Sequence, residues 1–255
     1  MARYSRYVAI GDSQTEGLWD GDDTVGLRGF ADRLAELVDA HDPGLTYANL
    51  AVRGRRIRDL LDDQLPQALA MKPDLVTVCI GMNDVTRPGP YFGHALAELE
   101  DLYAQLALSG ATVVTTTFPD LAQIIPIGRI LAARVLRIND EIRRATDWYG
   151  FRLVDLYDAP SMGHPDTWST DRVHGSPKGH ALFAAAAAEA LELPGSNHDW
   201  AEIGGPVRQS LRSQAYSQAL WTQNMLMPWL WRHVRGRSAG DGRMPRRPRL
   251  EALPT

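Results

Sequence analysis

The chain has 255 residues, 44% of them hydrophobic, which is enough to bury the core of one large domain with an appendage or of two small domains. Its formal net charge of −4 argues against a nucleic-acid binder, and no run of about 18 apolar residues is present that would span a membrane. The single cysteine, Cys79, excludes a disulfide within the chain.

Short apolar runs that predict strands alternate with segments of helical periodicity. The predicted strands are Tyr7–Gly11, Thr46–Leu50, Leu75–Gly81, Thr112–Thr117 and Arg152–Leu156. The predicted helices are Phe30–Asp39, Ile57–Met71, Tyr91–Leu108, Ile130–Trp148 and Pro177–Leu191. Several strands are almost wholly apolar, which is typical of strands covered on both faces. The alternation therefore predicts an α/β fold with a parallel sheet and helices on both sides.

The alternation ends near Leu193, so we place one domain at residues 1–193. Residues 194–235 predict a Pro- and Gly-containing linker followed by a helical extension. In this C-terminal segment Trp221, Trp229 and Trp231 stand beside a basic cluster, which consists of Arg232, His233, Arg235 and Arg237. The pattern fits either a helix packed on its own domain or a weak contact with a membrane surface. Residues 236–255 are rich in Gly, Pro and Arg, and we expect a disordered basic tail there.

The N-terminal residues lead straight into the first predicted strand, without the apolar region and cleavage site of a secretory leader. A lone cysteine also fits a reducing compartment. We therefore expect a cytoplasmic protein. Cys79 lies inside an apolar run with no partner beside it, so we expect a buried structural thiol and not a nucleophile.

Polar residues recur just after the predicted strands and before the last predicted helix. Ser13 follows the first strand, Gly54 comes after the second and Asn83 follows the third, while Asp171 and His174 precede the last helix. The carboxyl ends of parallel strands lie along one edge of a sheet. We therefore expect Ser13, Gly54 and Asn83 to meet at that edge.

These residue types suit nucleophilic catalysis. A serine nucleophile needs a general base, which His174 can supply, and Asp171 is close enough along the chain to orient the imidazole. The backbone N–H groups of Ser13 and Gly54 and the side-chain amide of Asn83 are candidate donors to an oxyanion. Each residue also has a structural alternative, as a helix cap, a turn residue or a hydrogen-bonded structural histidine.

The combination of blocks resembles the SGNH hydrolases, also called GDSL esterases/lipases. The matching blocks are Gly11-Asp12-Ser13, Gly54 after Asn49-Leu50-Ala51, Gly81-Met82-Asn83-Asp84 and Asp171-x-x-His174, and the resemblance covers roughly residues 5–193. One departure is Gln14, where the family often has Leu, and we expect it to affect only local packing.

The resemblance implies a role for each of these residues. Ser13 would be the nucleophile, His174 the base and Asp171 its partner, with Ser13, Gly54 and Asn83 forming the oxyanion hole. It also implies a three-layer α/β/α sandwich with a flavodoxin-like sheet, and neither a metal nor a cofactor.

Two loops near the predicted edge are candidate walls of an acyl pocket. One supplies Leu121 and Ile124, and the other supplies Met162 and Trp168. The alternative is that the apolar residues of the first loop only cap the core. A third loop, with Glu16, Trp19 and Asp20–Asp23, is a candidate contact for the leaving group.

We therefore expect a serine esterase that hydrolyses small or lipid-like acyl esters through an acyl-enzyme. A sugar O-deacetylase or a thioesterase remains open within this class. A non-catalytic ligand-binding module on the same scaffold is the alternative outside it, although such a module would be expected to have lost Ser13, His174 or Asp171. A phosphate or nucleotide binder is disfavoured, since no Gly-rich loop with Lys follows a strand.

Overall fold

A mostly parallel sheet forms the centre of the protein in the computed structural model, which describes residues 3–125, 128–202 and 239–253. Its six strands follow the order β7-β6-β5-β1-β4-β8. The parallel strands are β1 (Arg6–Gly11), β4 (Thr46–Asn49), β5 (Leu75–Cys79), β6 (Thr112–Thr116) and β7 (Arg152–Val154). The order of these parallel strands is that of a flavodoxin-like sheet, as predicted.

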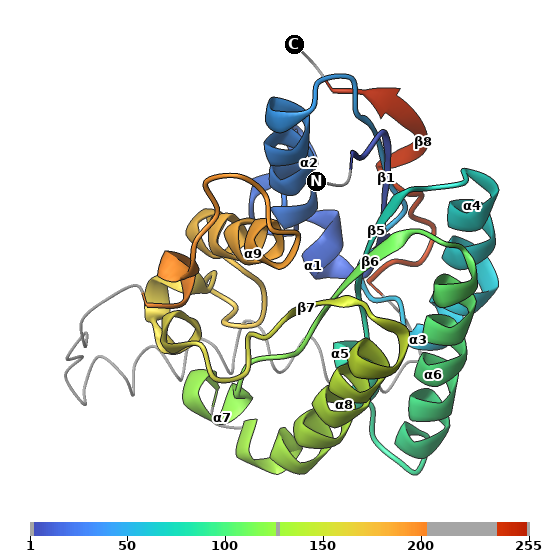
Figure 1. Ribbon diagram of the computed structural model, residues 1–255. Coiled ribbons are helices and arrows are strands. Elements are labelled where there is room, and N and C mark those ends of the chain that lie inside the picture. Colours follow the sequence, from blue (N-terminus) through green and yellow to red (C-terminus); the bar gives the residue numbers. More distant parts are fainter. Residues whose placement is uncertain (1–2, 126–127, 203–238, 254–255) are drawn as a thin grey trace.

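Helices cover both faces of the sheet (Figure 1). On one face lie α2 (Phe30–His41) and α9 (Pro177–Ala190). On the other lie α4 (Leu65–Ala70), α6 (Phe92–Leu108) and α8 (Gly128–Tyr149). The predicted three-layer α/β/α sandwich is therefore confirmed.

Short elements that the sequence did not predict stand at or near the strand ends. They are α1 (Ser13–Glu16), the two-residue strands β2 (Gly21–Asp22) and β3 (Gly26–Leu27), α5 (Met82–Val85), α7 (Leu121–Ile124) and the 3₁₀ turns Pro160–Gly163, Pro165–Thr167 and His198–Ala201. Several of them follow the carboxyl ends of β1, β5 and β6, so they shape the edge where ligands bind in such sheets.

The core forms where the helices bury their apolar sides against the sheet. Helix α6 buries Leu99, Leu102 and Leu106, whose spacing places them on one side of the helix. Each such side chain stabilises the fold by about 1.5–3 kcal/mol relative to exposure. Tyr7 and Tyr47, in register on β1 and β4, stack with ring centroids 4.9 Å apart.

The predicted helix over residues 57–71 contains a π-helical turn. It comprises α3 (Ile57–Asp59), the π turn Leu60–Gln64 and α4. Pro66 explains the wider turn, because it lacks an N–H and its ring clashes with the carbonyl of a regular helix four residues earlier. The turn directs Gln64 at the end of β1, where Oε1 accepts from Gly11 N at 2.9 Å and Nε2 donates to Gly11 O at 3.0 Å.

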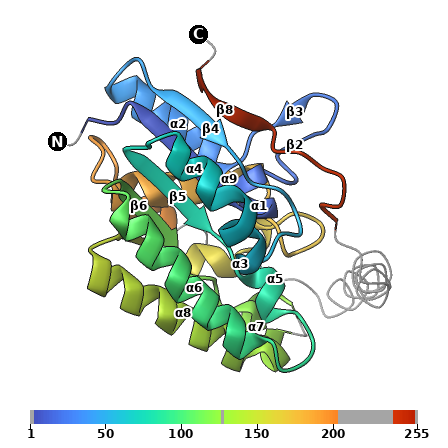
Figure 2. The same cartoon turned by 90° about the vertical axis from the view of Figure 1, so that its right-hand side faces the viewer.

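The prediction of a disordered tail over residues 236–255 is wrong where the structure describes them. Strand β8 (Arg247–Ala252) pairs antiparallel with β4 (Figure 2). Arg246, just before this strand, donates to Asp32 at 2.6 Å, and the guanidinium of Arg247, the first residue of the strand, lies 5.6 Å from the centre of the Tyr47 ring. Two of the arginines that suggested disorder by composition, Arg246 and Arg247, instead contact a charged and an aromatic partner, and the open edge of β4 supplies backbone partners.

Part of the predicted linker is packed as well. Trp200, in the turn His198–Ala201, is buried and donates its indole N–H to Glu189 of α9. The predicted helical extension and its membrane-surface contact fall on residues 203–238, outside the described residues. Within the ranges that the structure describes, no helix combines the length and apolar character needed to cross a membrane.

Candidate active site

Ser13 stands at the carboxyl edge of the sheet, as the first residue of α1. The chain reaches it through Gly11, whose φ is +155°. A Cβ at Gly11 would lie 2.3 Å from Thr15 Oγ1 and 2.5 Å from Cys79 O, so only glycine fits this turn. Asp12 then caps α1, because its Oδ1 accepts from Gln14 N at 3.2 Å.

The turn before α9 brings His174 and Asp171 to Ser13. His174 Nε2 lies 2.7 Å from Ser13 Oγ, and His174 Nδ1 lies 2.6 Å from Asp171 Oδ2. Asp171 Oδ1 also accepts from the backbone N–H of Val173 and of His174, both at 2.9 Å. Asp171 therefore makes an Asx-turn and orients the imidazole at the same time.

Asp171 is almost fully buried, with 1% of its surface exposed. Burial alone would raise its pKa, but hydrogen bonds from His174 and from Ser169 outweigh this effect and hold the pKa of Asp171 below its ordinary value. The carboxylate thus stays ionised at neutral pH and attracts a proton on the facing ring nitrogen. Ser13 Oγ then faces a ring nitrogen able to accept its proton.

Asn83, after β5, is tied to both neighbouring loops. Its Nδ2 donates to Asp12 Oδ2 at 3.1 Å and to Arg55 O at 2.8 Å. Arg55 follows Gly54, which has φ +78° in the turn after β4. Through these two hydrogen bonds Asn83 links the loop that contains Ser13 to the turn that contains Gly54. The carboxyl group of Asp12, which accepts one of the two bonds, is buried, and burial raises its pKa to about 6.

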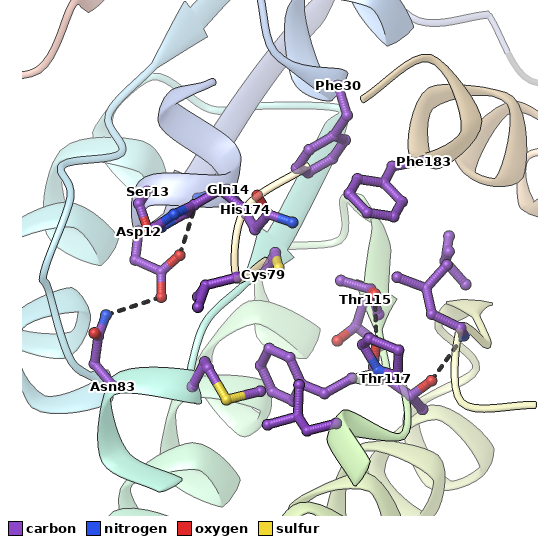
Figure 3. Close-up of a pocket in the computed structure, with 18 of the residues that line it drawn as sticks. Asp12, Ser13, Gln14, Phe30, Cys79, Asn83, Thr115, Thr117, His174 and Phe183 are labelled. Carbon is purple, nitrogen blue, oxygen red and sulfur yellow. Dashed lines mark hydrogen bonds between the residues drawn. The ribbon is translucent and has the colours of Figure 1, made fainter. Parts of the chain in front are cut away.

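A cavity of about 260 Å³ lies beside Ser13 and His174 (Figure 3). It runs along β5 and β6 toward α9, and its walls are mostly apolar. Residues that line it include Phe30, Cys79, Met82, Val114, Phe118, Leu121, Ile125, Val154, Leu156, Trp168, Phe183 and Ala187. An apolar chain attached to a group at Ser13 would find its walls here.

Two of the four predicted pocket residues line this cavity. Leu121 and Trp168 are among the lining residues, whereas Ile124 and Met162 are not. The next residue, Ile125, lines it in place of Ile124. Met162 is buried, and its carbonyl accepts the indole N–H of Trp168 at 2.7 Å. Met162 thus holds Trp168, which forms part of the cavity wall, without itself lining the cavity.

Cys79 lines the cavity and is buried. Burial raises the pKa of its thiol well above the ordinary value, so the thiol stays protonated and unreactive at neutral pH. Across the described ranges, His, Cys, Asp and Glu side chains do not gather in groups of three or more that could hold a metal ion.

The sequence did not identify Trp19 as a neighbour of Asp171. Its indole Nε1 donates to Asp171 Oδ2 at 2.7 Å, from a loop 152 residues away in the chain. No motif marks this contact, since a tryptophan in a loop has many other uses. His180 of α9 supports the same loop, with Nε2 3.0 Å from Leu18 O.

Comparisons with known proteins identify the family and the fold. A model of the GDSL-like Lipase/Acylhydrolase family matches residues 9–182. An acetylxylan esterase of Geobacillus stearothermophilus is 27% identical over 207 residues, which are 71% of this chain and 91% of that protein.

Two examples represent the solved structures that share the architecture. One is an alpha/beta hydrolase enzyme from the metagenome of Lake Arreo, Spain, with 25% identity and a TM-score of 0.62 over 75% of this chain and 97% of the other. The other is an acetylxylan esterase from Geobacillus stearothermophilus, with 20% identity and a TM-score of 0.61 over 82% and 100%.

Proposed function

The chain belongs to the GDSL-like lipase/acylhydrolase family, and from this premise we propose that it is a serine esterase with Ser13 as nucleophile, His174 as general base and Asp171 as the orienting carboxylate. Membership makes the chain an ester hydrolase. The observation that carries the finer assignment is the continuous hydrogen-bonded path from Ser13 Oγ through His174 to Asp171, with contacts of 2.7 and 2.6 Å.

Catalysis follows from this path in two steps. Ser13 Oγ attacks the ester carbonyl carbon while its proton passes to His174 Nε2, and the imidazolium is stabilised by Asp171. His174 then gives this proton to the leaving alcohol as the carbon–oxygen bond breaks, which leaves an acyl-enzyme. A water molecule then attacks the acyl carbon and gives its proton to His174. His174 returns this proton to Ser13 Oγ as the bond to the acyl group breaks, which releases the acid and restores Ser13.

The tetrahedral oxygen needs donors. We assign them to Ser13 N–H, Gly54 N–H and Asn83 Nδ2, and removing one such donor typically lowers turnover by about 100-fold. In the structure Asn83 Nδ2 donates to Asp12 and to Arg55 O. In the proposed reaction it shares or exchanges the hydrogen bond to Asp12 for one to the oxyanion.

The mostly apolar walls of the cavity favour acyl groups longer than acetyl. A volume of about 260 Å³ exceeds what a single methyl group fills. We therefore propose small to medium carboxylic acyl esters as substrates, with Leu121 and Trp168 in the acyl pocket. The related acetylxylan esterase favours a second candidate, an O-deacetylase acting on a sugar ester.

The test is a Ser13→Ala variant assayed with chromogenic acetyl, butanoyl and hexanoyl esters. We expect turnover to fall by about a thousand-fold or more with an unchanged melting temperature, because the nucleophile is lost and the fold is not. A serine-directed phosphonate should label the peptide that contains Ser13 in the parent protein and not in the variant.

Ser196→Ala is the matched control, since Ser196 lies in the loop after α9 and its hydroxyl donates to Leu193 O. It should keep full activity and labelling. Undiminished turnover in Ser13→Ala would refute the assignment.

A further inference from the structure

Trp19 shares a carboxylate oxygen with His174. Its indole Nε1 donates to Asp171 Oδ2 at 2.7 Å, and His174 Nδ1 lies 2.6 Å from the same oxygen. Asp171 Oδ1 is bound by the backbone of its own turn and by Ser169 Oγ at 2.7 Å. Trp19 therefore comes from a different part of the chain and holds the oxygen that faces the imidazole.

The backbone of Trp19 is strained. The φ angle of Trp19 is +73°. Bulky residues rarely adopt this left-handed conformation, and they keep it where the surrounding structure holds them in it. Both neighbours are anchored: Leu18 O lies 3.0 Å from His180 Nε2, and the Asp20 carboxylate accepts from Arg33 at 2.7 and 3.0 Å. The strained conformation delivers the indole N–H to Asp171.

We propose that Trp19 is a positioning residue for the reaction proposed above, and the inference depends on that function. The indole N–H holds the Asp171 carboxylate toward His174 and takes part of the negative charge of Oδ2. It thereby limits how strongly Asp171 stabilises protonated His174, and it keeps the imidazole aligned with Ser13.

Among the residues that the structure describes, two titratable groups besides Asp171 interact electrostatically with His174. They are Asp12, in the loop after β1, and His180, on α9. Burial lowers the pKa of His180 to about 4, so it stays neutral over the range in which an esterase is assayed. Asp12 bonds to Gln14 N and Asn83 Nδ2, whereas the Trp19 indole donates to Asp171, so we expect a shift of the acid limb between variants to report on Asp171.

The experiment compares Trp19→Phe with the parent protein in kcat, KM and the pH profile of kcat/KM. Phenylalanine keeps an aromatic ring and removes the donor. We expect kcat to fall about tenfold with little change in KM, because the imidazole is less well aligned. The acid limb should move to higher pH by roughly half a unit, because the carboxylate that lost its donor attracts the imidazolium more strongly.

Two further variants separate this role from a general loss of structure. Trp200→Phe removes the indole donor from another tryptophan–carboxylate pair, with Glu189, and should leave the acid limb unchanged. Trp19→Gly removes the donor where glycine adopts positive φ without strain, so it stays informative if Trp19→Phe folds poorly. It should lower kcat and move the acid limb in the same direction.

The outcomes distinguish the two proposals. An active Ser13→Ala variant overturns the proposed function. An inactive Ser13→Ala, together with folded Trp19 variants whose kcat and acid limb match the parent, overturns only the role of Trp19. A loss confined to KM or to melting temperature also overturns it, since that is the behaviour of a merely structural residue.

Discussion

Asp84 is a buried carboxylate next to the proposed oxyanion donor Asn83. Only 6% of it is exposed, and its Oδ2 accepts from Ile57 N at 3.1 Å. Burial raises its pKa to about 7. The folded state therefore keeps this proton at pH values where the unfolded chain has released it. The contribution of Asp84 to the free energy of unfolding should fall as pH rises from about 4 to about 7, the interval between its unfolded and folded pKa values.

Asp84→Asn should remove this pH dependence. Asparagine keeps an oxygen for Ile57 N and carries no charge to bury. We expect the free energy of unfolding at about pH 8 to rise by about 1–3 kcal/mol, with less change at about pH 5. Urea unfolding at both pH values measures it.

Asp140→Asn is the control, because this carboxylate is 74% exposed and contributes little. Equal destabilisation of Asp84→Asn at both pH values would contradict the argument.

At the scale of single residues, motif spacing predicted which residues lie together in the proposed active site. Ser13, Asp171 and His174 were identifiable because each follows a strand or precedes a helix in a fixed pattern. Trp19 and Gln64 were not, because their contacts with Asp171 and Gly11 join loops and turns whose paths depend on the folded core.

Helix α9 forms one wall of the cavity, and strands β5, β6 and β7 together form another. Ala187 of α9 lines it and is 1% exposed. A larger side chain at this position would occupy space that an acyl chain needs. We predict that Ala187→Leu lowers kcat/KM for a hexanoyl ester about tenfold and leaves an acetyl ester nearly unchanged, as measured with the chromogenic series.

Ala185→Leu makes the same change on the same helix at a partly buried residue that is not among the cavity-lining residues. It should affect both esters alike. If the parent protein already prefers acetyl steeply over butanoyl, the medium-chain proposal is wrong and the sugar O-deacetylase is favoured.

The elements themselves were largely predictable. Five apolar runs became the five parallel strands, because a strand covered on both faces must be apolar along its length. The short helices α1, α5 and α7 were missed because four residues show no periodicity. The π turn was missed because the apolar periodicity of the predicted helix over residues 57–71 continues across Pro66.

Arg246 joins the end of the chain to the body of the molecule. Its guanidinium lies 2.6 Å from Asp32, whose side chain is 10% exposed, while that of Arg246 is 25% exposed. Arg246→Ala removes the guanidinium from this buried carboxylate, which keeps the hydrogen bond from Gly29 N at 3.0 Å. We predict a loss of about 2 kcal/mol in the free energy of unfolding, which chemical denaturation measures.

Arg249→Ala removes an exposed guanidinium from the same strand and should change the stability by less than about 0.5 kcal/mol. Equal losses in both variants would show that Asp32 does not need Arg246.

At the scale of the molecule, the sandwich was predictable and its sixth strand was not. Strand alternation specifies the layers and the edge at which the site forms. Strand β8 carries Pro248 and two arginines, a composition typical of tails, and only the open edge of β4 and a buried Asp32 explain its order.

The pairing of β8 with β4 also constrains the order in which the protein assembles. Thr46 pairs with Ala252 across some two hundred residues of intervening chain, so this ladder closes a very long loop. During synthesis from the N-terminus, β4 must keep an unpaired edge until β8 has left the ribosome. We infer that the nascent protein is most prone to aggregation in that interval, and that joining of β8 ends it.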